Sequence, residues 1–148
     1  MRPRRKVVLV DHNEKRQAVN GIEEADVVEI VDHHRIADVS TANPILFLNL
    51  PIGSTATIVT LQFRQTGIEL PDSIARVLLS AILTDTVIMK SPTCTQVDVD
   101  QVNFLADKLG IDAVEYGMDI FRTRGARTKC PSPSWSRPIP RSSRSTTT

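Results

Sequence analysis

Two groups of polar residues directly follow apolar runs, and their side chains suit the coordination of a divalent metal ion. Asp11 comes after the run Val7–Val10, and Asp32-His33-His34 ends the run Val27–Val31. If both runs are parallel strands of an open sheet, their carboxyl ends face the crevice where such sheets bind ligands. Carboxylate together with imidazole suits Mn, Fe, Co or Zn better than an all-oxygen Ca or Mg cage. The sequence therefore predicts a metal site at this edge of the sheet.

Each group also has an ordinary structural interpretation, which the sequence leaves open. Asp11 is also suited to capping a following helix, and Asp32–Arg35 to forming a solvated loop. The paired histidines favour a site, because successive side chains of a strand point in opposite directions and both cannot be core residues. Asp85 is the third candidate, since it falls within the most apolar predicted helix, where a buried carboxylate needs a partner such as a metal ion. The alternative for Asp85 is that it lies with Thr84 and Thr86 on a polar stripe of the helix that faces solvent.

The elements that would position these residues alternate between strands and helices, which is typical of an α/β protein. We expect a parallel sheet with helices on both faces. Apolar runs predict strands at 6–10, 27–31 and 45–50, and helical spacing predicts helices at 14–25, 56–65, 71–91, 97–109 and 112–122. The helix that begins at Pro71 is apolar nearly all round, so we expect it to be buried and to end before Pro92.

Two short polar segments flank the predicted helices. Gly53-Ser54-Thr55 would open the second helix, where a hydroxyl can cap the free N–H groups or the helix terminus can hold an anion. Lys90-Ser91-Pro92-Thr93 contains turn and cap residues, and a phosphate contact by Lys90 is the less specific alternative. Neither segment is diagnostic by itself.

Composition limits the class of protein. Of 148 residues, 41% are hydrophobic but only 4% aromatic, so we expect one domain with an aliphatic core. Six basic and no acidic residues occur from Arg124 onward, which leaves 12 basic and 17 acidic residues before it, a net charge of −5. Such an acidic domain argues against nucleic-acid binding. Two cysteines, no secretory signal and no sufficiently long apolar stretch lead us to expect a cytoplasmic protein without a membrane partner.

The last part of the chain differs from the rest in composition. Residues 126–148 are rich in Pro, Ser and Arg and show no hydrophobic periodicity. We expect a disordered basic tail or a frame-shifted end, and a folded domain over residues 1–125.

Taken together, four motifs resemble the DHH phosphoesterase superfamily, and within it the manganese-dependent (family II) inorganic pyrophosphatases. The motifs are Val10-Asp11-His12-Asn13-Glu14, Asp32-His33-His34-Arg35, Gly53-Ser54-Thr55-Ala56-Thr57, and Ala81-Ile82-Leu83-Thr84-Asp85 followed by Lys90-Ser91-Pro92-Thr93. They occur in the family's order over about residues 6–125, and their combination is more specific than a lone DHH. The segment Glu14–Val19 is most similar to members with a regulatory CBS-domain insertion.

The resemblance implies a role for each matching position. Asp11 would bridge two metal ions, His33 and Asp85 would bind the second ion, and His34 would contact the substrate phosphate. Asp11 and His34 are then the catalytic residues, and Asp32 would orient the imidazoles. The implied reaction is hydrolysis of pyrophosphate to two phosphates, with two Mn²⁺ or Co²⁺ ions in the complete site and Mg²⁺ accompanying the substrate. A homodimer is compatible with this family.

The same resemblance predicts what this chain lacks. Family members begin with a His-x-x-Pro-Asp-x-Asp type motif and carry a second, DHHA2-like domain that clamps the substrate; neither is found here. We therefore expect a partial DHH domain that is inactive alone. Two alternatives stay open: a DHH phosphodiesterase acting on short oligonucleotides or cyclic dinucleotides, and a non-enzymatic metal-binding remnant.

Overall fold

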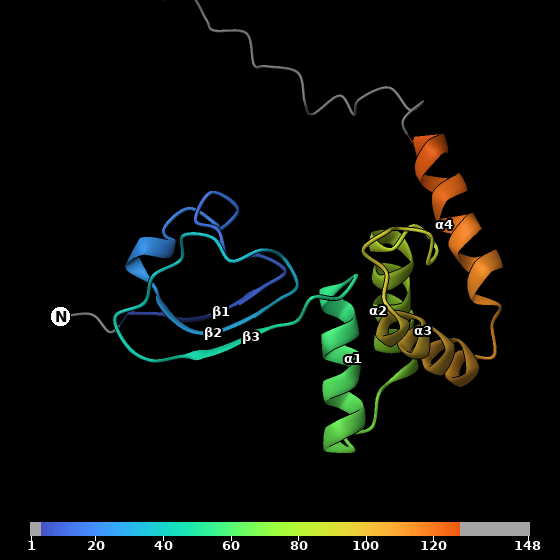
Figure 1. The fold of residues 1–148 in the computed structure, drawn as a ribbon, viewed down its shortest axis with the longest axis horizontal. Helices are drawn as coiled ribbons and strands as arrows, with labels where there is room; N and C mark the ends of the chain where they lie inside the picture. The colour runs from blue at the N-terminus through green and yellow to red at the C-terminus, as the bar shows by residue number, and fades with distance from the viewer. Residues whose placement is uncertain (1–3, 128–148) are drawn as a thin grey trace, which may run out of the picture.

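The computed structural model describes residues 4–127, which form a small sheet followed by a group of helices (Figure 1). The elements in chain order are β1 (Lys6–Val10), a 3₁₀ helix η1 (Ile22–Glu24), β2 (Asp26–Asp32), β3 (Leu46–Asn49), α1 (Thr55–Thr66), α2 (Asp72–Asp85), α3 (Gln96–Leu109) and α4 (Ala113–Arg127). The α/β class is confirmed, and the three predicted strands lie within two residues of their expected bounds.

The sheet is parallel throughout, with β2 between β1 and β3. Val10 pairs with Val31, which in turn pairs with Leu48. This register aligns the carboxyl ends of all three strands at one edge. The residues that follow each strand therefore meet there, as the sequence predicted.

The connection between β1 and β2 contradicts the helix predicted at 14–25. It consists of turns and the short η1, which follows Gly21 in a left-handed conformation with φ 91°. The segment has little apolar surface to bury, and its Val19 side chain is 77% exposed. Because isolated helices depend on packing of an apolar face, this segment lacks the stabilisation that an α-helix needs.

Most helices begin close to the positions that we predicted from their capping residues. Ser54 accepts a hydrogen bond from the N–H of Ala56 and caps α1, which ends at Gly67. The predicted extension of α2 to Pro92 is wrong, because the helix ends at Asp85. It is not buried all round either, since Ile74 and Val77 are exposed.

Two apolar clusters hold these elements together. The larger one joins α2 and α3 through residues such as Leu79, Ile82 and Leu105, with α4 packed against it. The smaller one joins Ile58 of α1 to Val31 of β2 and to Ile52. Figure 1 shows the helices gathered beyond the carboxyl end of the sheet, with α1 nearest to it. The β1–β2 connection, which the sequence predicted to be helical, contributes no α-helix to the cover of the sheet.

Two further predictions concern the ends and the environment of the chain. The predicted tail lies outside the described residues from position 128, and α4 continues to Arg127. None of the described helices combines the length and apolar character that crossing a membrane requires. Cys94 is a free thiol, and Cys130 lies outside the described residues.

Candidate metal centre

Asp11 is held at the end of β1 by contacts from two other elements. Its backbone N–H donates to the carbonyl oxygen of Val31 at 3.0 Å, which continues the sheet by one residue. Its φ of 66° is left-handed, a conformation that Asp tolerates better than most residues. The Thr55 hydroxyl, at the start of α1, donates to Asp11 Oδ1 at 2.8 Å. Asp11 therefore does not act as a helix cap, and its carboxylate is oriented but 57% exposed.

His33 directs its Nε2 atom toward Asp11. Its Nδ1 lies 2.9 Å from the carbonyl oxygen of Ile52, which can only accept, so Nδ1 carries the proton. In the neutral imidazole Nε2 carries the lone pair, and this atom lies 3.5 Å from Asp11 Oδ1. This is the tautomer that metal-binding histidines use, with the second nitrogen fixed by a hydrogen bond. The His33 side chain is 14% exposed, so burial also limits its orientation.

Asp32 is fully buried and organises the turn that carries both histidines. Its Oδ1 accepts from the backbone N–H groups of His33 and His34 at 2.8 and 3.2 Å, and from His34 Nδ1 at 2.8 Å. Its Oδ2 accepts from the side-chain amide of Asn13. Burial opposes ionisation, but the hydrogen bonds from His34, Asn13 and the backbone hold the pKa of Asp32 below its usual value. An ionised Asp32 therefore holds the His34 imidazole and the backbone of both histidines.

His34 lies beside His33 with its outer nitrogen free. Nδ1 contacts Asp32 Oδ1, and in the neutral imidazole with Nδ1 as the donor, Nε2 carries a lone pair that can bind a ligand. The two imidazole rings are 4.2 Å apart between centroids, and the His34 side chain is 48% exposed. Asn49 at the end of β3 donates to the His34 carbonyl oxygen at 2.8 Å. All three strand ends therefore contribute to the placement of this turn.

The donor set fits a divalent transition-metal ion. Asp11, His33 and His34 each offer one ligand atom, and these atoms all lie within 4.8 Å of one another. Metal–ligand bonds of about 2.1 Å separate neighbouring ligands by roughly 3.0 to 3.4 Å, depending on the coordination geometry. The 3.5 Å between His33 Nε2 and Asp11 Oδ1 is close to this separation, so both can bind one ion after a small adjustment.

Asp85 lies outside that group and differs from its prediction. It is the last residue of α2 and is exposed, rather than buried within the helix. Its Oδ2 accepts from the Ser54 hydroxyl at 2.6 Å. Because Ser54 precedes Thr55, which binds Asp11, the start of α1 connects the two carboxylates through adjacent hydroxyls.

Sequence reasoning missed two contributors to this arrangement. Asn13 is buried. Its side chain binds Asp32 and also the backbone of Arg35 and Ala37, which lie in the connection between β2 and β3. Asp98, in the first turn of α3, binds Gly53 and Thr57 of the α1 start. The signal for Asp98 was its spacing from Thr95, since a Thr followed three residues later by an acidic residue resembles a capping box. No local signal distinguishes Asn13 from an ordinary loop asparagine.

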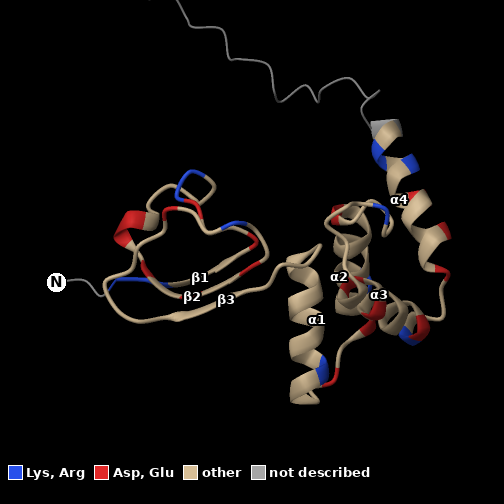
Figure 2. Cartoon of the chain, viewed as in Figure 1, with Lys and Arg blue, Asp and Glu red and all other residues tan. Residues whose placement is uncertain are grey.

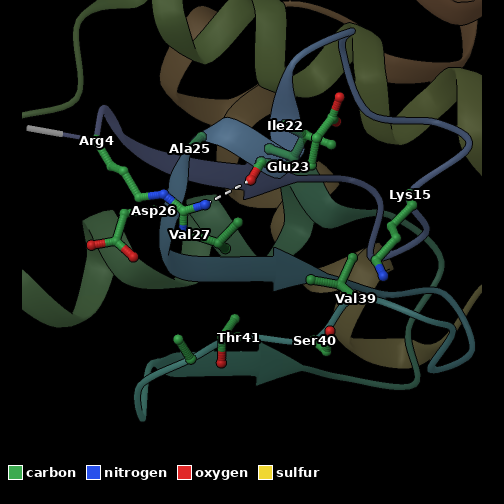
Figure 3. A pocket seen from close by; sticks show the side chains of 11 residues that line it. Arg4, Lys15, Ile22, Glu23, Ala25, Asp26, Val27, Val39, Ser40 and Thr41 are labelled. Carbon is green, nitrogen blue, oxygen red and sulfur yellow. Dashed lines mark hydrogen bonds between the residues drawn. The ribbon is translucent and has the colours of Figure 1, made fainter. Parts of the chain in front are cut away.

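The pockets of the described residues only partly coincide with the site. A small one of about 60 Å³ lies beside His34 and Arg35 and is also lined by His12 and Asn13. A second pocket, larger than the first at about 250 Å³ (Figure 3), is lined by residues near the start of β2 and by the loop 39–42. There the Arg4 guanidinium donates to the Glu23 carbonyl oxygen at 3.0 Å. Because none of the three grouped ligands lines the larger pocket, it is separate from the candidate metal centre.

Known proteins resemble this chain in sequence. The model of the DHH family, N-terminal domain, matches residues 1–82. A "Probable manganese-dependent inorganic pyrophosphatase" of Archaeoglobus fulgidus is 57% identical over 108 residues, which cover 73% of this chain and 34% of that protein. A "Cobalt-dependent inorganic pyrophosphatase" of Clostridium perfringens is 47% identical over 119 residues, 80% of this chain and 22% of that one.

A solved structure gives the same result at the level of the fold. The crystal structure of a Methanococcus jannaschii protein, described as a "putative family II inorganic pyrophosphatase", superposes with a TM-score of 0.76 at 38% identity. The match covers 80% of this chain and 42% of that one. The chain thus spans about a third of the length of the Archaeoglobus relative and less than half of the solved structure. With a family model that matches more than half of its residues, the chain belongs to the DHH family.

Proposed function

We propose that this chain provides part of the active site for metal-dependent hydrolysis of inorganic pyrophosphate to two phosphates. The observation that carries the proposal is the convergence of Asp11, His33 and His34 ligand atoms within 4.8 Å at the carboxyl edge of a parallel sheet. The relatives described above, named as manganese- or cobalt-dependent pyrophosphatases, support the substrate and the metals.

In this proposal each residue has a role that its contacts support. Asp11 and His33 hold Mn²⁺ or Co²⁺, with Asp85 as a further ligand of a two-ion site, and His34 binds the substrate phosphate. Divalent ions in such a site activate water and neutralise phosphoryl charge, and Mg²⁺ accompanies the substrate. Asp32 orients the His34 ring through the hydrogen bond between its Oδ1 and His34 Nδ1, which leaves Nε2 on the outer side of the ring. The Thr55 hydroxyl fixes Asp11 before any ion is bound, which reduces the reorganisation on binding.

The proposal extends to the domain and its setting. Residues 1–125 act as the DHH domain, and the groups that surround the substrate on its other side come from sequence that the relatives contain and this chain does not match. We place the protein in the cytoplasm, in agreement with the free Cys94 thiol. Its proposed partners are pyrophosphate and a second copy of the chain, and not nucleic acid or a membrane.

A chimera tests this function directly. The matched 108-residue segment of the Archaeoglobus relative would be replaced by that of this chain, which is 57% identical to it. We expect Mn²⁺-dependent phosphate release from pyrophosphate, and loss of this activity in the Asp11→Asn chimera. Asp100→Asn is the matched control, because Asp100 is exposed on α3 and its carboxylate accepts a hydrogen bond from Gln96 of the same helix.

Three outcomes of this test would contradict the proposal. The first is a folded chimera without activity beside an active parent protein. The second is activity that survives Asp11→Asn. The third is a preference for a short oligonucleotide or cyclic dinucleotide over pyrophosphate, which would identify a phosphodiesterase instead.

A further inference from the structure

The buried carboxylate of Asp98 connects the starts of two helices on the side of α1 that bears the candidate site. Asp98 is fully buried, and no Lys, Arg or His within residues 4–127 forms an ion pair with it. Its Oδ2 accepts from the N–H of Gly53 at 2.8 Å and from the N–H and hydroxyl of Thr95 at 2.8 and 2.7 Å. Its Oδ1 accepts from the Thr57 hydroxyl at 2.6 Å. The charge is therefore stabilised entirely by hydrogen bonds.

These bonds exceed what a helix cap requires. The capping box of α3 uses only Thr95 and Asp98. The bonds to Gly53 and Thr57 instead reach across to α1, at a sequence separation of more than 40 residues. Gly53 allows this approach, because a Cβ there would lie 3.0 Å from Asp98 Oδ2 and 2.7 Å from Thr86 Cγ2.

The residues between these two anchors are the hydroxyl donors of the site. Gly53 and Thr57 enclose Ser54 and Thr55, which donate to Asp85 and Asp11 respectively. A carboxylate that fixes both ends of this five-residue segment also limits how its hydroxyl groups can turn. Hydrogen-bonded residues of this kind orient metal ligands and tune metal affinity.

We propose that Asp98 is a positioning residue that holds the Ser54 and Thr55 hydroxyls on the carboxylates of Asp85 and Asp11. The effect on metal binding rests on the proposed function, whereas the effect on the hydroxyl–carboxylate contacts does not. Asp98 itself touches neither the ion nor the substrate. The competing explanation is that Asp98 only stabilises the α1–α3 packing.

A pair of threonine substitutions in α1 separates these explanations. Thr57→Val removes the hydroxyl that binds Asp98 Oδ1. Thr60→Val is the matched control, because Thr60 is equally buried in the same helix and its hydroxyl binds only the carbonyl oxygen of Ala56, within the helix. Thr57→Ser restores the hydroxyl without the methyl group. All four proteins would be the full 148-residue chain.

The first measurement is Co²⁺ titration, followed by the visible ligand-field spectrum and calorimetry. We expect Thr57→Val to weaken Co²⁺ binding about tenfold, the lower end of the range for residues that support metal ligands. Its spectrum should change as well. Thr60→Val should keep wild-type affinity within about twofold, and Thr57→Ser should recover most of the loss. Equal affinity and identical spectra in Thr57→Val and Thr60→Val would overturn the positioning role.

The second measurement is made without metal. Carboxyl ¹³C resonances of Asp11 and Asp85 and the amide resonances of Ser54 and Thr55 should shift in Thr57→Val and stay in place in Thr60→Val. If the wild-type chain binds no Co²⁺, the proposed function fails, while these shifts still support the positioning of the carboxylates. Unchanged resonances in Thr57→Val would overturn the inference whatever the metal titration gives.

Discussion

Replacing His33 by Ala is the sharpest test of the candidate metal centre. In His33, one of the three grouped ligands, Nε2 faces Asp11, while Nδ1 is fixed by the backbone carbonyl of Ile52. We expect the 148-residue chain to bind Mn²⁺ or Co²⁺ weakly, because Asp11, His33 and Asp85 leave further coordination positions to water. Removing His33 deletes one of two protein ligands that lie at bonding separation.

The expected loss of metal affinity follows from the removal of one of these two ligands. Loss of a residue that merely supports a ligand weakens metal binding by about 10- to 100-fold, so loss of the ligand itself should reach the upper end. A 100-fold change corresponds to about 2.7 kcal/mol of binding free energy. Calorimetric titration with Mn²⁺ would measure it directly. Thermal unfolding gives a second readout, since an ion at ten times its Kd stabilises the folded state by about 1.4 kcal/mol.

His12→Ala is a closely matched control for this experiment. The His12 Nδ1 atom binds the Val10 carbonyl oxygen at 3.0 Å, much as His33 Nδ1 binds Ile52. Both variants therefore lose one imidazole and one bond to a backbone carbonyl. His12 is not among the grouped ligands, so its variant should keep the wild-type affinity. Equal binding by the wild-type and His33→Ala chains, or equal losses in both variants, would refute the assignment of His33.

The remaining predictions concern Asp98, the turn after α2, and activity. Burial opposes ionisation of Asp98, but the hydrogen bonds from Thr57, Thr95 and Gly53 hold its pKa below the usual value. Its ionised form therefore stabilises the fold above the unfolded pKa of about 3.9, and this contribution is lost as the pH falls through the folded pKa. Urea titrations at pH 7 down to 3 would measure the unfolding free energy of wild type and Asp98→Asn. The difference between the two proteins should decrease as the pH falls, and a constant difference would contradict this. Val87→Gly should stabilise the protein in thermal unfolding by up to about 1 kcal/mol, because Val87 is exposed with a φ of 50°. The control Val77→Gly, within α2, should destabilise the protein by about 0.5 kcal/mol. If neither variant is stabilised, Val87 is not strained. Finally, the 148-residue chain alone should release negligible phosphate from pyrophosphate with Mn²⁺, because Asp11, His33 and Asp85 do not complete a two-ion site, and robust turnover would contradict this ligand count.

The part of the site that the sequence predicted depends on local rules. Apolar runs of five or six residues predicted the strands, and parallel strands bring their carboxyl ends to one edge. Asp11 and His33 were therefore expected to meet although 22 positions separate them, and the structure places their ligand atoms 3.5 Å apart. The start of α1 was predicted equally well, because Ser54 acts as an ordinary N-cap whose position depends on its neighbours.

The place of Asp85 could not be predicted in this way, because tertiary packing ends its helix. The apolar periodicity of α2 continues into Val87-Ile88-Met89, yet these residues take left-handed φ values of 50° to 59°. Ile88 is buried against Gly117 of α4, where a Cβ would lie 3.0 Å from Ile88 Cγ1. Such a turn costs about 1–2 kcal/mol per residue, and burial of Ile88 offsets part of that cost. The result turns Asp85 toward the start of α1, where Ser54 binds it.

The distribution of charge explains why this site calls for a cation. Acidic and basic residues are interspersed over the described chain (Figure 2), yet no Lys or Arg within residues 4–127 forms an ion pair with Asp11, Asp32 or Asp85. Hydroxyl, amide and imidazole donors hold these carboxylates instead, and the N-terminus of α1 adds a partial positive charge. Such donors fix geometry but neutralise little charge. A paired lysine or arginine would occupy the carboxylate oxygens that a metal needs. The arrangement therefore keeps the exposed carboxylates of Asp11 and Asp85 oriented, negatively charged and accessible, which is the state in which a divalent ion binds most strongly.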